Sequence, residues 1–379
     1  MMIVYVLILV FLVLEGFVRL YRYLRYTEGF KSSYSEAKPK SLSFQSHPYI
    51  LYVKGTNNEG LYPSNSMGYG GKREFSKIKP IDGVRIYCVG GSTVEGHDVT
   101  GGPDTSWPGK LQDILLKKFS NKMIECINAA AGGYTTAESL IEFLLRGIDL
   151  KPDILLVYHN VNDAWTAQMV EGFKTDYSHA RLHKKWKVPW LYFIPQIPYF
   201  ASYQTLRGWV VNRFAKANAL LYWISNPPWQ ATMNFKKEAV ETFRRNIIHL
   251  ILTSKGWGCI PVLIKWECDW TAKDWHVPPH LVGEKDKVRT MYHRYLAANN
   301  ETLKAIASEF SCPYFDLTSF EPYHFSDTVH FSSQGLDEMS RRIAKQLEPI
   351  VSSILELKNG KTERPFYQEQ KEGQRENIT

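Results

Sequence analysis

The chain has 379 residues, of which 46 are Lys or Arg and 38 are Asp or Glu, so the formal net charge is 46 − 38 = +8. Hydrophobic residues make up 44% and charged residues 22%, which is ordinary globular usage and excludes a largely disordered chain. A collagen, a coiled coil and a multi-span membrane protein are excluded too, because no matching repeat or series of apolar runs occurs. The basic residues do not alternate with aromatics as in nucleic-acid-binding modules, so we expect no nucleic-acid partner.

Residues 1–26 are predicted to form an N-terminal transmembrane or membrane-anchor helix. Residues 1–14 are apolar without interruption, and Arg19, Arg22 and Arg25 follow at helical spacing. The run is short for a spanning helix of about 20 residues, so a helix lying in the membrane interface is an alternative. A helix buried in the globular domain is a third possibility. No basic residue precedes the run and no small-residue cleavage site follows it, which disfavours a cleaved signal peptide.

Residues 27–80 are polar and contain scattered Gly, Pro, Ser and Asn, so we interpret them as a linker and an irregular lead-in. From residue 81 to residue 355, short apolar runs alternate with helical periodicity. This alternation predicts an α/β fold with a parallel sheet between two helix layers. The predicted strands are 84–89, 123–127, 153–158, 259–265 and 314–317, and the predicted helices are 107–119, 137–150, 235–253, 289–310 and 330–354.

Two segments do not follow this alternation of predicted strands and helices. Residues 165–230 hold six of the 11 tryptophans and five prolines, which indicates an aromatic-rich insertion. It is either a small subdomain with its own core or a surface that faces substrate or membrane. Residues 356–379 are almost devoid of apolar side chains and are predicted to be a disordered tail.

The five cysteines include no C-x-x-C pair, so we expect reduced thiols, which favours a reducing compartment.

Four short motifs carry groups that could act together on one reacting centre. Gly90-Gly91-Ser92-Thr93 follows the first predicted strand, where a parallel sheet places its sites. The glycine-containing segment 128–134 and Asn162 follow the next two predicted strands and offer backbone and side-chain N–H groups. Asp327 and His330 are three residues apart, so the carboxylate can orient the imidazole as a base for a serine.

This set of motifs resembles the SGNH (GDSL-type) hydrolases, in particular a bacterial membrane-anchored branch. The blocks that match the family are Gly-Gly-Ser-Thr at 90–93, Asn-Ala-x-x-x-Gly-Tyr-Thr-Thr at 128–136, Val-Asn-Asp at 161–163 and Asp-x-x-His at 327–330. The blocks that resemble the membrane-anchored branch are Asn-Ser-Met-Gly-Tyr at 65–69 and Lys-Pro-Asp at 151–153. The resemblance implies a flavodoxin-like three-layer α/β/α sandwich and an enzyme that acts on acyl esters.

By the same resemblance, each catalytic group is assigned to a residue. Ser92 is the nucleophile, His330 the general base and acid, and Asp327 the residue that orients His330. The backbone N–H groups of Ser92 and Gly133 and the side chain of Asn162 form the oxyanion hole. No metal or other cofactor is implied.

The chain departs from the family pattern at three positions, Gly91, Asn160 and Gly132, which puts the substrate in doubt rather than the catalytic groups. Glu95, His97 and Asp98 lie close together in sequence like metal ligands, but no further ligand set accompanies them. We therefore expect no metal site.

The sequence predicts a membrane-anchored serine esterase that hydrolyses an O-acyl ester of a glycan or a lipid. An acyltransferase with a sugar acceptor, or a catalytically silent scaffold that binds glycans or partner proteins, are the alternatives. The arginines after the apolar run place the catalytic domain on the cytoplasmic face. Related enzymes often work outside the cytoplasm, so the side of the membrane stays open.

Overall fold

The computed structural model describes residues 2–26, 44–47, 49–56, 63–96, 102–168, 173–180, 202–203, 206, 234–273, 275, 285–317 and 319–360. The chain divides into two compact units. One contains residues 1–42 and 178–230, and the other contains residues 43–177 and 231–379.

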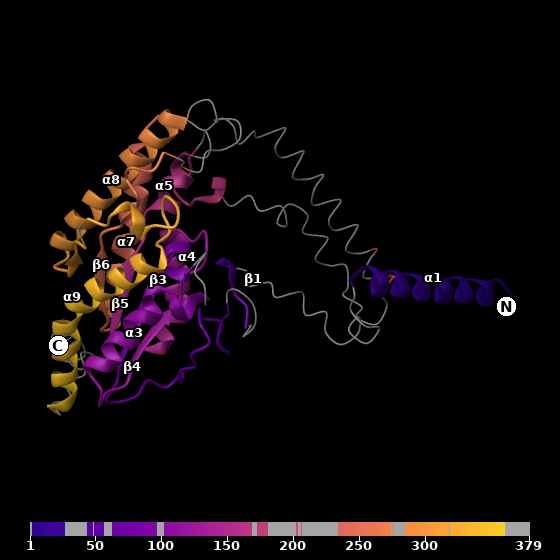
Figure 1. Cartoon of the computed structure of the whole chain (residues 1–379), viewed down its shortest axis with the longest axis horizontal. Helices are drawn as coiled ribbons and strands as arrows, with labels where there is room; N and C mark the ends of the chain where they lie inside the picture. The colour runs from indigo at the N-terminus through magenta and orange to yellow at the C-terminus, as the bar shows by residue number, and fades with distance from the viewer. Residues whose placement is uncertain are drawn as a thin grey trace, which may run out of the picture. The chain divides into compact units, whose positions relative to one another are not determined.

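A five-stranded parallel sheet forms the centre of the second unit (Figure 1). Its spatial order is β4-β3-β5-β6-β7, which in chain order of the five strands is 2-1-3-4-5, the flavodoxin-like doubly wound arrangement. The predicted three-layer α/β/α fold is therefore confirmed. The strands are β3 (Val84–Gly90), β4 (Ile124–Asn128), β5 (Ile154–Tyr158), β6 (Ile260–Ile264) and β7 (Tyr314–Phe315).

Helices cover both faces of this sheet because its central strands are apolar on both sides. In β3, Ile86 and Cys88 pack into one core with helices α3 and α9, whereas Tyr87 and Val89 pack into a second core with α7. In Figure 1, α3 and α9 lie side by side. The helices of this unit are α2 (Ser92–Glu95), α3 (Trp107–Lys118), α4 (Thr136–Glu142), α5 (Val161–Gln168), α7 (Lys237–Gly256), α8 (Lys285–Glu309) and α9 (Ser333–Asn359).

A small antiparallel hairpin lies within the segment that the sequence assigns to an irregular lead-in. Strand β1 (Phe44–His47) pairs with β2 (Leu51–Lys54). Further along this segment, the Gly70 N–H donates to the carbonyl oxygen of Asn128, at the end of β4, over 2.8 Å. Part of residues 27–80 is therefore ordered structure attached to the sheet of the second unit.

The first unit contains helix α1 (Met2–Tyr26). Glu15 is buried in this helix, where its carboxylate contacts Arg19 over 2.7 Å and accepts hydrogen bonds from the N–H and hydroxyl of Ser202 over 2.8 and 2.6 Å. Within the described part of the chain, no helix is sufficiently long and apolar to cross a membrane. The transmembrane alternative for residues 1–26 is thus not supported.

Several other predictions fall partly or wholly outside the described residues. Most of the aromatic insertion at 165–230 and residues 361–379 of the predicted tail are among them. Helix α9 extends through part of the predicted tail and ends at Asn359. The five cysteines are free thiols, and Cys88, Cys259 and Cys268 are buried.

Candidate active site

Ser92, His330 and Asp327 lie in one chain of hydrogen bonds. The Ser92 hydroxyl is 2.8 Å from Nε2 of His330, and Nδ1 of His330 is 2.6 Å from Oδ2 of Asp327. Ser92 begins α2 directly after β3, and the other two residues lie in the loop that precedes α9. The structure thus brings together groups that are 238 residues apart in the sequence.

The Asp327 carboxylate is held by more than the imidazole. Its Oδ1 accepts the backbone N–H groups of Val329 and His330, each over 2.7 Å. Partial burial acts to raise the pKa of Asp327, but the hydrogen bond and charge of His330 and the two N–H donors outweigh it and lower the pKa to about 2. Asp327 is therefore ionised at neutral pH and can fix the tautomer of His330.

The turn that carries Ser92 requires two glycines because its neighbours approach so closely. A Cβ atom on Gly90 would lie 2.2 Å from a methyl group of Val94, and one on Gly91 would lie 2.3 Å from Nδ2 of Asn162. Real Cβ atoms do not tolerate such distances. Glycine at position 91 thus allows the Asn162 amide to reach the backbone next to the nucleophile.

The predicted oxyanion residues border Ser92. Gly133 has a φ of +80°, a conformation that side-chain-bearing residues rarely adopt. The side-chain amide of Asn162 donates one N–H to the carbonyl oxygen of Tyr134 over 2.8 Å. An amide carries a second N–H, which this bond leaves for another acceptor. The backbone N–H of Ser92 lies in the first turn of α2, where helical N–H groups have no partner within the helix.

Two residues of the matching motifs support the site without reaching its reacting atoms. Asn128 donates from its amide to the carbonyl oxygen of Val94 over 3.1 Å, which ties the end of β4 to α2. Asp163 is buried and accepts hydrogen bonds from the hydroxyl groups of Thr136 and Tyr177 over 2.5 and 2.9 Å. No function was predicted from the sequence for Asn128 or Asp163, although both lie inside the motifs that match the family.

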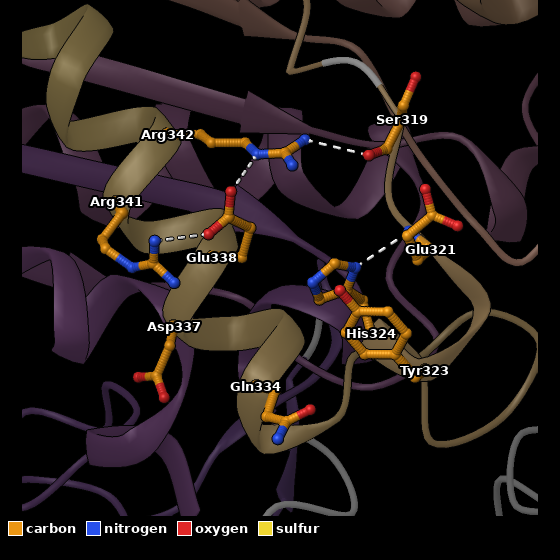
Figure 2. Close-up of a pocket in the computed structure, with 9 residues that line it drawn as sticks. All are labelled: Ser319, Glu321, Tyr323, His324, Gln334, Asp337, Glu338, Arg341 and Arg342. Carbon is orange, nitrogen blue, oxygen red and sulfur yellow. Dashed lines mark hydrogen bonds and ion pairs between the residues drawn. The ribbon is translucent and has the colours of Figure 1, made fainter.

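Paired charges of α9 and residues of the loop before it line a surface hollow of about 520 Å³ (Figure 2). Glu338 contacts Arg341 and Arg342, each over 2.7 Å, and Arg342 also donates to the carbonyl oxygen of Leu317 over 2.5 Å. Nδ1 of His324 accepts the N–H of Glu321 over 2.9 Å. Arg342 thus ties α9 to one end of the loop that holds Asp327 and His330, and the bond between Glu321 and His324 closes a turn within it.

Of the three residues considered as metal ligands, Glu95 lies in the described part of the chain. No group of three or more His, Cys, Asp or Glu side chains there is placed to hold a metal ion. Glu95 is instead paired with Lys54 over 2.8 Å. His97 and Asp98 lie outside the described residues.

A serine, a histidine and a carboxylate in one hydrogen-bonded chain at the edge of a doubly wound parallel sheet are typical of hydrolases that use a serine nucleophile. The comparisons with known proteins specify the family. The model of the GDSL-like lipase/acylhydrolase family matches residues 88–337, more than half of the chain, and the chain belongs to this family. No curated protein matches the chain.

Solved structures similar to the chain share little sequence with it. A GDSL-like lipase from Bacteroides thetaiotaomicron is 14% identical with a TM-score of 0.40, covering 73% of this chain and 93% of its own. Axe2, an acetylxylan esterase from Geobacillus stearothermophilus, is 14% identical with a TM-score of 0.41, covering 71% and 96%.

Proposed function

We propose that the chain is a serine esterase that hydrolyses an O-acyl ester of a glycan or a lipid through Ser92, His330 and Asp327. The hydrogen-bonded chain from the Ser92 hydroxyl through His330 to Asp327 carries this proposal. A serine hydroxyl is a weak nucleophile at neutral pH, and an adjacent base held in one tautomer is what activates it.

The geometry supports the following mechanism. His330 Nε2 takes the hydroxyl proton while Ser92 Oγ attacks the carbonyl carbon of the ester, and the electron pair of the C=O bond moves to the oxygen. The N–H groups of Ser92 and Gly133 and the amide of Asn162 stabilise the resulting oxyanion. The C=O bond then re-forms as the ester C–O bond breaks, and His330 gives its proton to the departing alkoxide, which leaves an acyl-enzyme. Water attacks this acyl-enzyme while His330 takes a proton from it. His330 returns that proton to Ser92 Oγ as the bond between the acyl carbon and Oγ breaks, which releases the acid.

Replacement of the nucleophile tests this proposal. The full-length Ser92→Ala chain should lose hydrolysis of a short-chain aryl acetate and labelling by a fluorophosphonate probe, because both reactions need the Ser92 oxygen. Ser353, an exposed serine on α9, provides the matched control as Ser353→Ala. Equal hydrolysis by wild-type and Ser92→Ala chains would contradict the proposal. Transfer of the acyl group to an added glycan, instead of to water, would favour the alternative that the enzyme is an acyltransferase.

The oxyanion hole is tested separately through Asn162. Removal of one such donor costs roughly 10²–10³ in turnover when the chemical step is limiting, so Asn162→Ala should lower kcat by about that factor. KM should change little, because the interaction forms mainly in the transition state. The exposed Asn121 supplies the control, Asn121→Ala. An unchanged kcat for Asn162→Ala would remove Asn162 from the proposed oxyanion hole.

We further propose that helix α1 attaches the chain to a membrane surface by lying in the interface. Most of its described apolar side chains are exposed, including Leu9 at 63% and Phe17 at 69%. Exposed apolar surface of this extent is typical of an interaction site, and the pairing of Glu15 with Arg19 offsets the one acidic charge.

For the side of the membrane we propose the cytoplasmic face. The free thiols of all five cysteines agree with a reducing compartment. Alkaline phosphatase and GFP fused in turn after residue 379 test this side. A fluorescent GFP fusion with inactive phosphatase supports the cytoplasmic face, and the reverse result contradicts it.

A further inference from the structure

The hairpin of β1 and β2 contacts the loop that carries Gly133. The hydroxyl of Tyr52, in β2, donates a hydrogen bond to the carbonyl oxygen of Gly132. In return, the hydroxyl of Tyr134 donates to the carbonyl oxygen of Tyr52 over 2.5 Å, and the two tyrosine rings pack with their centroids 5.3 Å apart. The loop is therefore held from outside by a segment 80 residues earlier in the sequence.

The group that Tyr52 holds is the peptide between Gly132 and Gly133. In a planar trans peptide, the carbonyl oxygen and the following N–H point to opposite sides. Because the Gly132 oxygen is bonded to the hairpin, the Gly133 N–H is directed away from the hairpin. The nucleophile lies beside this peptide, since a Cβ atom on Gly132 would be 4.0 Å from the Cβ of Ser92.

Two successive glycines give this peptide little orientation of its own. Glycine adopts positive and negative φ almost equally readily, so neither residue strongly resists rotation of the peptide plane. Rotation by half a turn would direct a carbonyl oxygen, instead of an N–H donor, to the side on which the oxyanion forms. An oxyanion hole needs donors that are already oriented before the reaction.

A second contact fastens the hairpin to the helix of the nucleophile. Nζ of Lys54, at the end of β2, lies 2.8 Å from Oε1 of Glu95 in α2, and the two side chains are 3% and 2% exposed. The hairpin thus connects α2, which begins with Ser92, to the loop of Gly133. It lies outside the 88–337 segment that matches the family.

We propose that Tyr52 is a positioning residue of the oxyanion hole, whose hydroxyl keeps the Gly132–Gly133 peptide turned so that the Gly133 N–H can donate to the oxyanion. This inference rests on the proposed function and deepens it. Tyr52 acts through the peptide and does not touch the reacting atoms.

The full-length Tyr52→Phe chain tests the inference, because it loses only the hydroxyl. Loss of a whole donor costs roughly 10²–10³, so loss of the group that orients one should lower kcat on an aryl acetate by about 10-fold or more, with KM changed less than about twofold. Inhibition by phenylboronic acid should weaken by the same factor as kcat/KM, because its adduct with Ser92 is a tetrahedral anion. Tyr49→Phe is the control, since Tyr49 lies in the same hairpin and is 72% exposed.

The outcomes separate the inference from the proposed function. Equal kcat and boronate inhibition for Tyr52→Phe and Tyr49→Phe overturn the inference while the esterase stands. A raised KM with unchanged kcat also overturns it, because that pattern indicates a contact with the ground state. A lower kcat without weaker boronate inhibition indicates a general structural defect and overturns it too. Absence of Ser92-dependent hydrolysis in the wild-type chain overturns both.

Discussion

Asp163 is next to Asn162 in the sequence, but the two side chains serve different purposes. Asn162 extends to the backbone beside Ser92, whereas Asp163 is buried and accepts hydrogen bonds from Thr136 in the first turn of α4. Burial raises the pKa of the Asp163 carboxyl from 3.8 to about 7, although the hydrogen bonds from Thr136 and Tyr177 act in the opposite direction. A carboxyl group in this position makes the stability of the catalytic unit depend on pH.

The sign of this dependence follows from the raised pKa. Between about pH 4 and pH 7 the folded chain keeps the Asp163 proton and the unfolded chain loses it, so the free energy of unfolding falls as the pH rises. In Asp163→Asn this contribution is absent. We therefore expect the stability of Asp163→Asn relative to wild type to increase across this window, by about 1.4 kcal/mol per unit of pKa shift, and to be constant above it.

Urea unfolding of both chains at several pH values measures the difference. The comparison cancels other buried groups such as His159, whose pKa burial lowers to about 3. Asp82 is exposed, so Asp82→Asn should show no such trend. A constant difference between wild type and Asp163→Asn from pH 4 to pH 8 would disprove the assignment of this titration to Asp163.

At the scale of elements, the attachment of the hairpin to α2 depends on two buried charges. Removal of one partner leaves the other charge buried without compensation, which typically costs about 3–5 kcal/mol. We expect Lys54→Met to lower the free energy of unfolding by about that amount. The double variant Lys54→Met/Glu95→Leu should recover much of the loss, because it buries no charge.

Urea unfolding of the two single variants and the double variant completes this cycle. Lys77 is exposed, and Lys77→Met should leave the unfolding midpoint unchanged. If the effects of Lys54→Met and Glu95→Leu simply add, the two side chains do not interact and the hairpin is not fastened in this way.

The elements of the sheet were predictable because each gives a local signal. The apolar run from Val84 to Val89 and the glycines after it indicate a buried strand and a turn without reference to the rest of the chain. The predicted helix over 137–150 is less regular in the structure, where α4 ends at Glu142 and a π-helical turn, Phe143–Gly147, follows. The hairpin was missed although β2 falls in the short apolar run 49–53, because its strands have four residues each and the segment around them is mostly polar.

The residues of the candidate site also divide into those with a local signal in the sequence and those without one. Ser92, Asp327 and His330 could be proposed from motifs, because residue types and spacing suggest their chemistry. The contact of Tyr52 with Gly132 spans 80 residues and the pairing of Lys54 with Glu95 spans 41, as 95 − 54. Nothing local in the sequence distinguishes Tyr52 from the many other tyrosines of the chain, 22 in all. Only the fold reveals which of them contacts the loop of Gly132 and Gly133.

At the scale of the whole molecule, the exposed apolar side chains of α1 predict binding to lipid. Leu9 and Val13 are 63% and 64% exposed, and burial of one such side chain contributes roughly 1.5–3 kcal/mol. The full-length chain with Leu9→Asn and Val13→Asn should bind phosphatidylcholine–phosphatidylglycerol vesicles at least about 10-fold more weakly than wild type. Vesicle flotation measures this binding.

Two apolar residues of the other unit that are more exposed than Leu9 and Val13 provide the control. Ile78 and Ile81 are 83% and 90% exposed, and their replacement by Asn should leave flotation unchanged. Equal flotation of wild type and the Leu9/Val13 variant would show that α1 does not attach the chain to lipid.

The 238 residues between Ser92 and His330 have a consequence for the synthesis of the protein. A ribosome completes the serine, its turn and the loop of Gly133 long before it reaches the histidine, which lies 49 residues from the end of the chain, as 379 − 330. Domains emerge and begin to fold from the N-terminus. While the residues between them are synthesised, the nascent chain therefore carries the serine without the histidine, and truncated products that end before residue 330 lack the pair on which the proposed esterase activity depends.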